Sequence, residues 1–441
     1  MKLTSSYDVE IKKIDFKISD TIKVYREALS FCIDAFDKEW GDINPITKNK
    51  ERVNFAEHLI HSTDSNTAKY DFDTKFYKFP SYLRRAVIQD ALGCVSSYQS
   101  NLDNWNKTHI GKKPTLTIDR NATPTFYHKN MYLTSDNLYE CQIKVYLNND
   151  WVWRTIRLLK TDVDYIQKHL KGTIQSAPTL EKRYKKYFLR FAFTERVGLN
   201  TKDIQKQRIC SVDLGLNTDA VCTVLTSDGT VHARKFINFP CEKDQLYTVL
   251  NRIKKRQRKY KNQKQTLIWQ YATRLNEELS VKIAAAIIEY AKEQNCDVIV
   301  FEYLDMKKKK SGNYKQKLSV WRKNGIQKIA MFKAHKNGMR VSRICAKNTS
   351  KLAFDGSGNV KRDDKNCANA TFSNGKQYNA DLNASYNIGA RYFIREIIKP
   401  LGETQRLQFV AKVPEIARRT TCTYSTLLQL NSAIEELKAA A

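Results

Sequence analysis

The sequence predicts a multidomain α/β protein, and three observations lead to this fold class. The chain has 441 residues, which is too long for one compact core, so two or three domains are expected. Segments in which polar and apolar residues alternate, as in strands, are followed along the chain by segments with the periodicity of helices, about 3.6 residues. Glycine and proline are sparse, at 15 and 8 residues, which excludes a low-complexity chain.

The first half of the chain predicts a small β-barrel that is interrupted by a helical bundle. Residues 5–13 alternate like a half-exposed strand, and the pattern becomes helical from about residue 20 to residue 105. A "GKKP" turn then leads into a hairpin over residues 139–158 and a further strand near residues 187–193. The predicted domains are therefore 1–18 and 109–205 for the barrel, with the helical bundle, 19–108, inserted between them.

The second half has the order of elements that is typical of an RNase H-like fold. Three strand-like segments follow one another from about residue 207, a long helical stretch comes next, and "CDVIVFEYLD" then predicts a buried fourth strand. Later segments predict another strand and several helices. The predicted divisions are 206–345 and 379–400 for the RNase H-like domain, 346–378 for an insert and 401–441 for a helical tail.

Three acidic residues occupy positions that favour a metal site in this fold. Asp213 and Glu302 end the first and the fourth strand, which lie side by side in an RNase H-like sheet. Asp381 falls in the first turn of a helix that Asn379 can cap. Two adjacent carboxylates repel each other unless a cation lies between them. Three oxygen ligands suit Mg²⁺, and two such ions would hydrolyse a phosphodiester.

Each acidic residue by itself also has a structural explanation. Asp213 could belong to a turn, Glu302 could end a strand in a salt bridge, and Asp381 could be a helix-start carboxylate favoured by the dipole. Their joint occurrence in the right order of elements favours the metal site.

The charge of the chain predicts a polyanionic partner. Lysine and arginine number 76 against 46 acidic residues, a net charge of +30, which nucleic acid would neutralise. A merely soluble basic surface is the alternative. The lysine-rich segment 306–317 is either a DNA-contacting loop or a solubilising one. The predicted nucleic-acid-binding residues are Arg84, Arg85, Arg252, Lys254, Lys255, Arg256, Arg258, Lys259 and Lys261.

The cysteine pattern and the hydropathy predict a cytoplasmic protein. Ten cysteines are scattered with no CxxC pair, as expected for reduced thiols. No signal peptide and no stretch long enough to span a membrane is evident, so we expect no membrane partner.

Several motifs resemble those of TnpB nucleases and miniature type V CRISPR effectors. The motifs "VDLGLNTDAVCTVLTSDGTV", "DVIVFEYL" and "NADLNASYNIGAR" look like the three RuvC motifs of these proteins. "WRKNGIQKIAMFKAHKNGMRVSRICAKNTSK" looks like the helix between the second and third motifs, and the "LRRAV" helix and "GKKP" turn look like the N-terminal half. The resemblance spans most of the chain and is strongest from about residue 208 to residue 392.

The resemblance implies an RNA-guided DNA endonuclease whose metal-binding triad is Asp213, Glu302 and Asp381. Its barrel and helical modules would hold a guide RNA and read a short motif beside a double-stranded target DNA. The protein would act as a monomer or as a homodimer.

One departure from these families concerns zinc. They carry two CxxC pairs before the last motif, whereas the corresponding positions here are Ala353, Gly356, Thr371 and Asn374. Cys345 and Cys367 are too few and too far apart for a tetrahedral site, so we expect a degenerate zinc ribbon that binds no zinc and is held by packing or by nucleic acid.

Arg362 and the function of the chain each have more than one interpretation. Arg362 lies near the position where related proteins place an arginine over the active site, so it could bind the scissile phosphate or be a solvated loop residue. The alternative functions are a guided DNA-binding repressor with little or no cleavage and an unguided RNase H-like nuclease.

Overall fold

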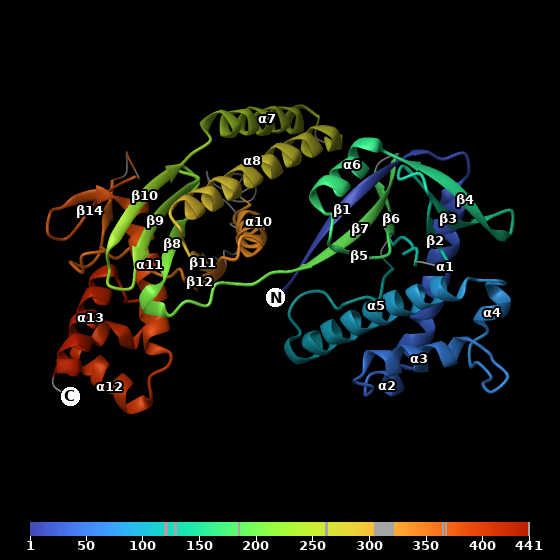
Figure 1. The fold of residues 1–441 in the computed structure, drawn as a ribbon, viewed down its shortest axis with the longest axis horizontal. Coiled ribbons are helices and arrows are strands. Elements are labelled where there is room, and N and C mark those ends of the chain that lie inside the picture. Colours follow the sequence, from blue (N-terminus) through green and yellow to red (C-terminus); the bar gives the residue numbers. More distant parts are fainter. Residues whose placement is uncertain are drawn as a thin grey trace. The chain divides into compact units, whose positions relative to one another are not determined.

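The computed structural model describes residues 1–118, 122–127, 130–183, 186–260, 263–303, 322–363, 366 and 368–439. These residues form two compact units (Figure 1). One unit comprises Lys2–Glu195, and the other comprises Met1 together with Arg196–Ala441. No helix within the described ranges is both long and apolar enough to cross a bilayer.

The first unit contains one seven-stranded sheet in the order β2-β3-β4-β1-β7-β5, with β6 also paired to β7. The first strand thus lies between strands that are more than a hundred residues later in the chain, which confirms that prediction. The described strands do not close a ring, so the predicted barrel is an open half-barrel. The bounds are β1 Lys2–Lys13, β2 Tyr132–Thr134, β3 Glu140–Leu147, β4 Asp150–Leu158, β5 Ile174–Gln175, β6 Thr179–Arg183 and β7 Lys186–Arg196.

The predicted hairpin is formed by β3 and β4. Leu147 pairs with Asp150, which leaves Asn148 and Asn149 as a two-residue turn. Both asparagines have positive φ, +50° and +61°, as a type I′ turn requires and as asparagine tolerates.

The helices of this unit share a single hydrophobic core with its sheet. Val9 of β1, Tyr25 of α1, Val87 of α5 and Ile143 of β3 all belong to one cluster of buried side chains. The sequence predicted the sheet and the bundle as separate domains, whereas these residues pack as one body. The helices are α1 Ile18–Lys38, α2 Trp40–Ile43, α3 Asn49–Ile60, α4 Phe72–Lys75, α5 Ser81–Thr108 and α6 Lys160–His169.

The second unit is built on a five-stranded sheet in the order β10-β9-β8-β11-β12. Strands β8, β9 and β10 form an antiparallel meander, and β11 lies parallel between β8 and β12. The fourth strand therefore lies beside the first, as predicted. The bounds are β8 Arg208–Asp213, β9 Ala220–Thr226, β10 Val231–Ile237, β11 Val298–Tyr303 and β12 Arg340–Cys345.

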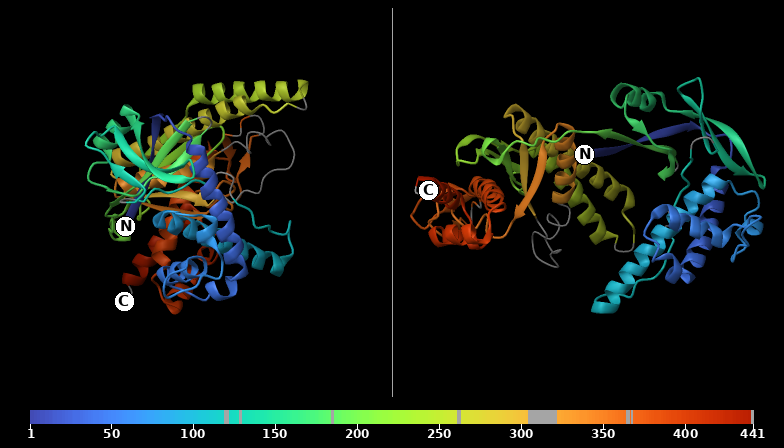
Figure 2. Two further views of the ribbon diagram at one scale, coloured as in Figure 1. Left: turned by 90° about the vertical axis from the view of Figure 1, so that its right-hand side faces the viewer. Right: turned by 60° about the horizontal axis from the view of Figure 1, so that its bottom comes forward.

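Helices cover both faces of this sheet. Alternate strand residues such as Val212 and Phe301 pack against α7, α8 and α10, while Ile209 and Val300 pack against α11, α12 and α13. Helices α7 and α8 lie next to each other as a helical hairpin (Figures 1 and 2). The bounds are α7 Pro240–Lys259, α8 Thr266–Glu293, α10 Lys323–Lys336, α11 Ala380–Ile398, α12 Glu403–Lys412 and α13 Tyr424–Ala439, with 3₁₀ turns at Ile204–Lys206 and Pro414–Ala417.

A small three-stranded sheet precedes α11. It consists of β13 Lys361–Arg362, β14 Asn369–Thr371 and β15 Gln377–Asn379, and both strand pairs are antiparallel. None of the nine cysteines in the described ranges takes part in a disulfide bond; Cys367 lies outside those ranges.

Candidate active site

The parallel pairing of β8 and β11 brings Asp213 and Glu302 to the same edge of the sheet. Val212 is in register with Phe301, so the acidic residue that follows each of them lies at the same level. Neighbouring strands are separated by about 4.8 Å. Side chains alternate between the two faces of a strand, and Ile209 and Val300, two or four residues before the acids, face α11. Asp213 and Glu302 therefore both lie on the face that α11 covers.

Helix α11 supplies the third acidic residue at its first turn. The Asn379 side chain caps the helix, because its Oδ1 accepts hydrogen bonds from the backbone N–H groups of Asp381 (3.1 Å) and Leu382 (2.9 Å). This confirms the predicted cap. The Asp381 carboxylate accepts a hydrogen bond from Thr218, in the loop after β8.

Asp213 lies within electrostatic range of the other two carboxylates. Burial raises the pKa of Asp213 well above its usual range, and the charges of Glu302 and Asp381 raise it further. Burial likewise raises the pKa of Glu302 and the pKa of Asp381. Asp213 is surrounded by protein atoms, yet part of its surface still reaches solvent. A group of partly buried acids that resist ionisation is stabilised by a nearby positive charge.

Hydroxyl groups hold two of these carboxylates in the structure. Oε1 of Glu302 accepts a hydrogen bond from the Thr349 hydroxyl, and Thr218 bonds Asp381 as described above. Gln327 of α10 donates to the Glu302 backbone carbonyl at 2.9 Å. No three His, Cys, Asp or Glu side chains in the described part of the chain converge closely enough to hold a metal ion. The donor set itself, three carboxylates from separate segments, is of the kind that Mg²⁺ prefers.

Arg362 places a positive charge near these acids. It lies at the end of the exposed strand β13, and its guanidinium opposes the raised pKa of both Asp213 and Asp381. The role of Arg362 in binding a phosphate stays a prediction.

A row of polar side chains on α11, which the sequence analysis missed, supports the site. Asn383, Asn387 and Arg391 recur every four residues on one side of the helix, and all three are buried. Nδ2 of Asn387 donates to the carbonyls of Thr349 and Leu352, each at 2.9 Å. This row of side chains therefore holds the loop after β12 in place. That loop contains Thr349, whose hydroxyl bonds the Glu302 carboxylate. The spacing of three polar residues in an otherwise apolar helix was the available sequence signal.

Helix α11 also approaches the sheet very closely. A Cβ added at Gly389 would lie 2.6 Å from Cδ1 of Leu225 and 3.2 Å from Oγ of Ser211. Ser385 of the helix and Thr223 of β9 share a buried hydroxyl contact of 2.5 Å. Small residues on this side of α11 thus let the helix lie flat on the strands that carry the acids.

The segment 346–378 has a packed core of its own. Ala353, Ala370 and Phe372 are buried together, and the Phe354 ring meets the Phe372 ring edge-on at 5.6 Å. Nδ2 of Asn374 donates to Oδ2 of Asp355 at 3.1 Å, which joins the two turns of the segment. Two of the positions that would carry cysteine in a zinc ribbon, Ala353 and Asn374, thus contribute packing and a hydrogen bond.

The predicted cations of α7 are exposed. Among the six that the structure describes, none has an ion-pair partner in the described ranges, and only Ile253 within this stretch is buried. They remain available to a polyanion. The six are Arg252, Lys254, Lys255, Arg256, Arg258 and Lys259; Lys261 lies outside the described residues, as does the lysine-rich segment 306–317.

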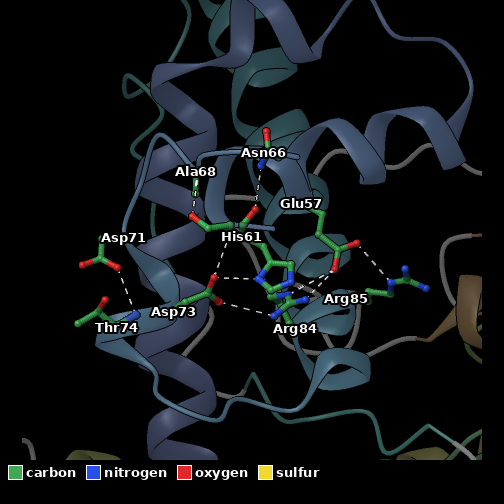
Figure 3. Close-up of polar contacts among 10 residues, drawn as sticks. Glu57, His61, Asn66, Ala68, Asp71, Asp73, Thr74, Arg84 and Arg85 are labelled. Carbon is green, nitrogen blue, oxygen red and sulfur yellow. Dashed lines mark hydrogen bonds and ion pairs between the residues drawn. The ribbon is translucent and has the colours of Figure 1, made fainter. Parts of the chain in front are cut away.

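The prediction for Arg84 is corrected by its surroundings (Figure 3). Arg84 retains 7% of its surface and lies 3.2 Å from Glu57 and 3.6 Å from Asp73. His61 bonds the same Asp73 carboxylate at 2.8 Å. Arg84 is therefore a buried residue that forms structural ion pairs, and its guanidinium is not exposed to a phosphate. Arg85 is exposed but contacts Glu57 at 3.4 Å.

The chain is similar in fold to two solved structures, at low sequence identity. One is the structure of the mini-RNA-guided endonuclease CRISPR-Cas_phi3, with a TM-score of 0.55 and 12% identity over 88% of this chain and 92% of that one. Another is a Cas12f1–sgRNA–target DNA complex, with a TM-score of 0.51 and 15% identity over 84% of this chain and 80% of that one.

The sequence comparisons match a smaller part of the chain than the structural ones do. The model of the Aq_aa04 family matches residues 5–147. No curated protein matches the sequence.

Proposed function

We propose that this protein is an RNA-guided, Mg²⁺-dependent DNA endonuclease with an RNase H-like catalytic domain of the RuvC type. The observation that carries the proposal is the parallel pair β8 and β11, which carry Asp213 and Glu302 at corresponding ends, on the face where α11 begins with Asp381. The fold shared with RNA-guided nucleases supports the same assignment.

Asp213, Glu302 and Asp381 would hold the metal, and the bound ions would supply an activated water and charge stabilisation at the leaving oxygen. Thr349 and Thr218 orient two of the carboxylates through the hydrogen bonds described above. The Asn387 bonds to the Thr349 loop keep that orientation fixed. Such supporting contacts commonly decide how well a carboxylate site works.

The basic residues would receive the nucleic acid. We propose that Arg362 binds a phosphate of the strand being cut, and that the exposed cations of α7 contact a nucleic-acid backbone. Guide pairing would read the target sequence, and the protein would read a short motif beside it.

We also propose that segment 346–378 folds without zinc. The support is its buried side-chain cluster and the Asn374–Asp355 hydrogen bond, which occupy the places where a ribbon would carry metal ligands.

The test of the main proposal is cleavage by the protein together with the RNA that co-purifies with it. That RNA is sequenced, a matching target DNA is supplied, and cutting is followed with Mg²⁺ or with EDTA. Asp213→Ala should lower the cleavage rate by on the order of 10³-fold while RNA and target binding persist. Glu289→Gln, an exposed acid on α8, is the matched control. Cutting retained by Asp213→Ala would refute the assignment.

A guided DNA-binding protein without cleavage is the second candidate. It is favoured by the finding that the described carboxylates do not converge as a metal-ligand set. Guided binding with no cutting under any divalent cation would select it. Cutting by RNA-free protein would instead select an unguided nuclease.

A further inference from the structure

A cationic pocket lies at the edge of the five-stranded sheet, away from the three acids. It is bounded by β12, the second half of α11 and the segment from α12 to residue 422, and its volume is about 630 Å³. The α11 residues that line it begin 10 residues after Asp381, and Ile394 and Ile398 lie 13 and 17 residues after it. At 1.5 Å per residue, these two isoleucines are about 20–25 Å along the helix from the acid.

The pocket has an apolar floor and a cationic rim. Four side chains of its lining are buried and apolar, while four lysine or arginine side chains around it are exposed. The floor is formed by Ile344, Ile394, Ile398 and Cys422. The rim is formed by Arg343, Lys399, Arg406 and Arg419.

The two arginines inside the pocket, Arg391 and Arg395, already have hydrogen-bond or ion-pair partners, whereas the rim cations have no ion-pair partner among the described residues. Arg391 is buried and donates to four backbone carbonyls. Arg395 bonds Glu396, the only carboxylate in the lining, and the Ser342 hydroxyl. None of the four rim cations has an ion-pair partner among the residues that the structure describes. Like charges gathered around a cavity repel one another until an anion binds between them.

We propose that this pocket binds one nucleotide of a single-stranded nucleic acid, with phosphates at the rim and the base or sugar against the apolar floor. The volume lies in the range of small-molecule sites, about 300–1,000 Å³. Single strands are usually held by a cationic groove together with side chains against which the bases stack, most often aromatic ones. Here the isoleucine floor would take the place of the aromatic side chains. A duplex would have to unpair and unstack a base to insert it into the pocket, at a cost of a few kcal/mol, so it should bind more weakly than a single strand.

This site does not depend on the nuclease function. Its ligand would bind whether or not Asp213, Glu302 and Asp381 hold metal, and its test needs no cleavage.

The experiment uses the full-length protein without divalent cation, after a high-salt wash that removes bound RNA. The probes are a single-stranded oligonucleotide of about 10 nucleotides, the same sequence as a duplex, and AMP. Hydrogen–deuterium exchange reports the region 394–422, and fluorescence anisotropy at several salt concentrations reports affinity. The variant is Arg406→Glu with Arg419→Glu. The control is Arg418→Glu, the same type of substitution at an exposed neighbour outside the lining, which reverses one charge where the variant reverses two.

The single strand should protect the region 394–422 in the native protein and in the Arg418→Glu control, and not in the double variant. The double variant should bind about tenfold more weakly, with a smaller salt slope. Its thermal midpoint should stay unchanged, since both arginines are exposed. Absence of protection, or an equal loss in the control, would overturn the proposal. Equal protection by the duplex would exclude an inserted nucleotide, and equal protection by AMP would make the ligand a free nucleotide.

Discussion

Replacing Asn387 by leucine should destabilise the second unit and weaken its active site together. Asn387 is fully buried, and its side chain makes three hydrogen bonds to backbone groups. It donates to the carbonyls of Thr349 and Leu352 at 2.9 Å each and accepts from the Tyr424 N–H at 3.0 Å. Leucine has the same branching and the same number of side-chain heavy atoms, so the substitution removes the hydrogen bonds with little change of shape, although its two methyl groups are bulkier than the amide atoms.

The expected loss follows from these three contacts. Each bond contributes about 1 kcal/mol net, and buried backbone groups left without partners add to the penalty, so the free energy of unfolding should fall by about 3–5 kcal/mol. For a unit of this size the thermal midpoint should drop by about 6–20 °C. Cleavage should fall as well, because the loop that carries Thr349 no longer holds Glu302 in place.

Asn431→Leu serves as the graded control for this measurement. Among the described residues, the Asn431 side chain makes one hydrogen bond, to the Ser227 carbonyl at 2.9 Å, so the midpoint of this variant should fall by about one third as much. Calorimetry or fluorescence melting measures both variants, and circular dichroism checks that each is folded. A shift for Asn387→Leu no larger than that for Asn431→Leu would refute the reasoning.

Three further predictions separate structural from functional charges and test the segment before α11. Arg84→Ala should cost about 3 kcal/mol of stability, because it removes the buried ion-pair partner of Glu57 and leaves that carboxylate with the exposed Arg85. Lys255→Glu should leave melting unchanged and weaken nucleic-acid binding; the reverse pattern would restore the original assignment of Arg84. Burial alone would raise the pKa of Asp8, but hydrogen bonds from Arg190 and Arg183 outweigh it and lower that pKa. Asp8→Asn should therefore lower stability by about 1–2 kcal/mol at pH 7, and the difference should close as the pH falls below about 3.9 and through the lowered pKa; a difference that grows on acidification in urea titrations would contradict this. Phe372→Ala should cost about 3 kcal/mol, while a zinc chelator should leave the melting curve unchanged; a large chelator effect on melting would refute the zinc-free segment.

The arrangement of the three acids was predictable because it follows from local patterns and strand order. Alternation along residues 209–213 and 298–302 identified two buried strands that end in acids. The order of elements then placed these strands side by side, and the Asn379 cap fixed the start of the third segment. Each of these inferences needs only neighbours in the sequence and a general rule of sheet topology.

The environment of each charge was not predictable in the same way. Arg84 and the cations of α7 look alike in the sequence, yet Arg84 is buried against Glu57 and Asp73 while the α7 residues are exposed. The open half-barrel and the single core of the first unit likewise depend on contacts between distant segments.

The sequence by itself therefore determined which residues could form the carboxylate site, because strand alternation, capping and charge are written in neighbouring positions. Only the tertiary structure decided which cations are free, which polar residues of α11 support Thr349, and where a cationic pocket forms at the sheet edge. The physical reason is that burial and charge pairing are set by whatever packs against a side chain, and those partners come from parts of the chain that no local pattern identifies.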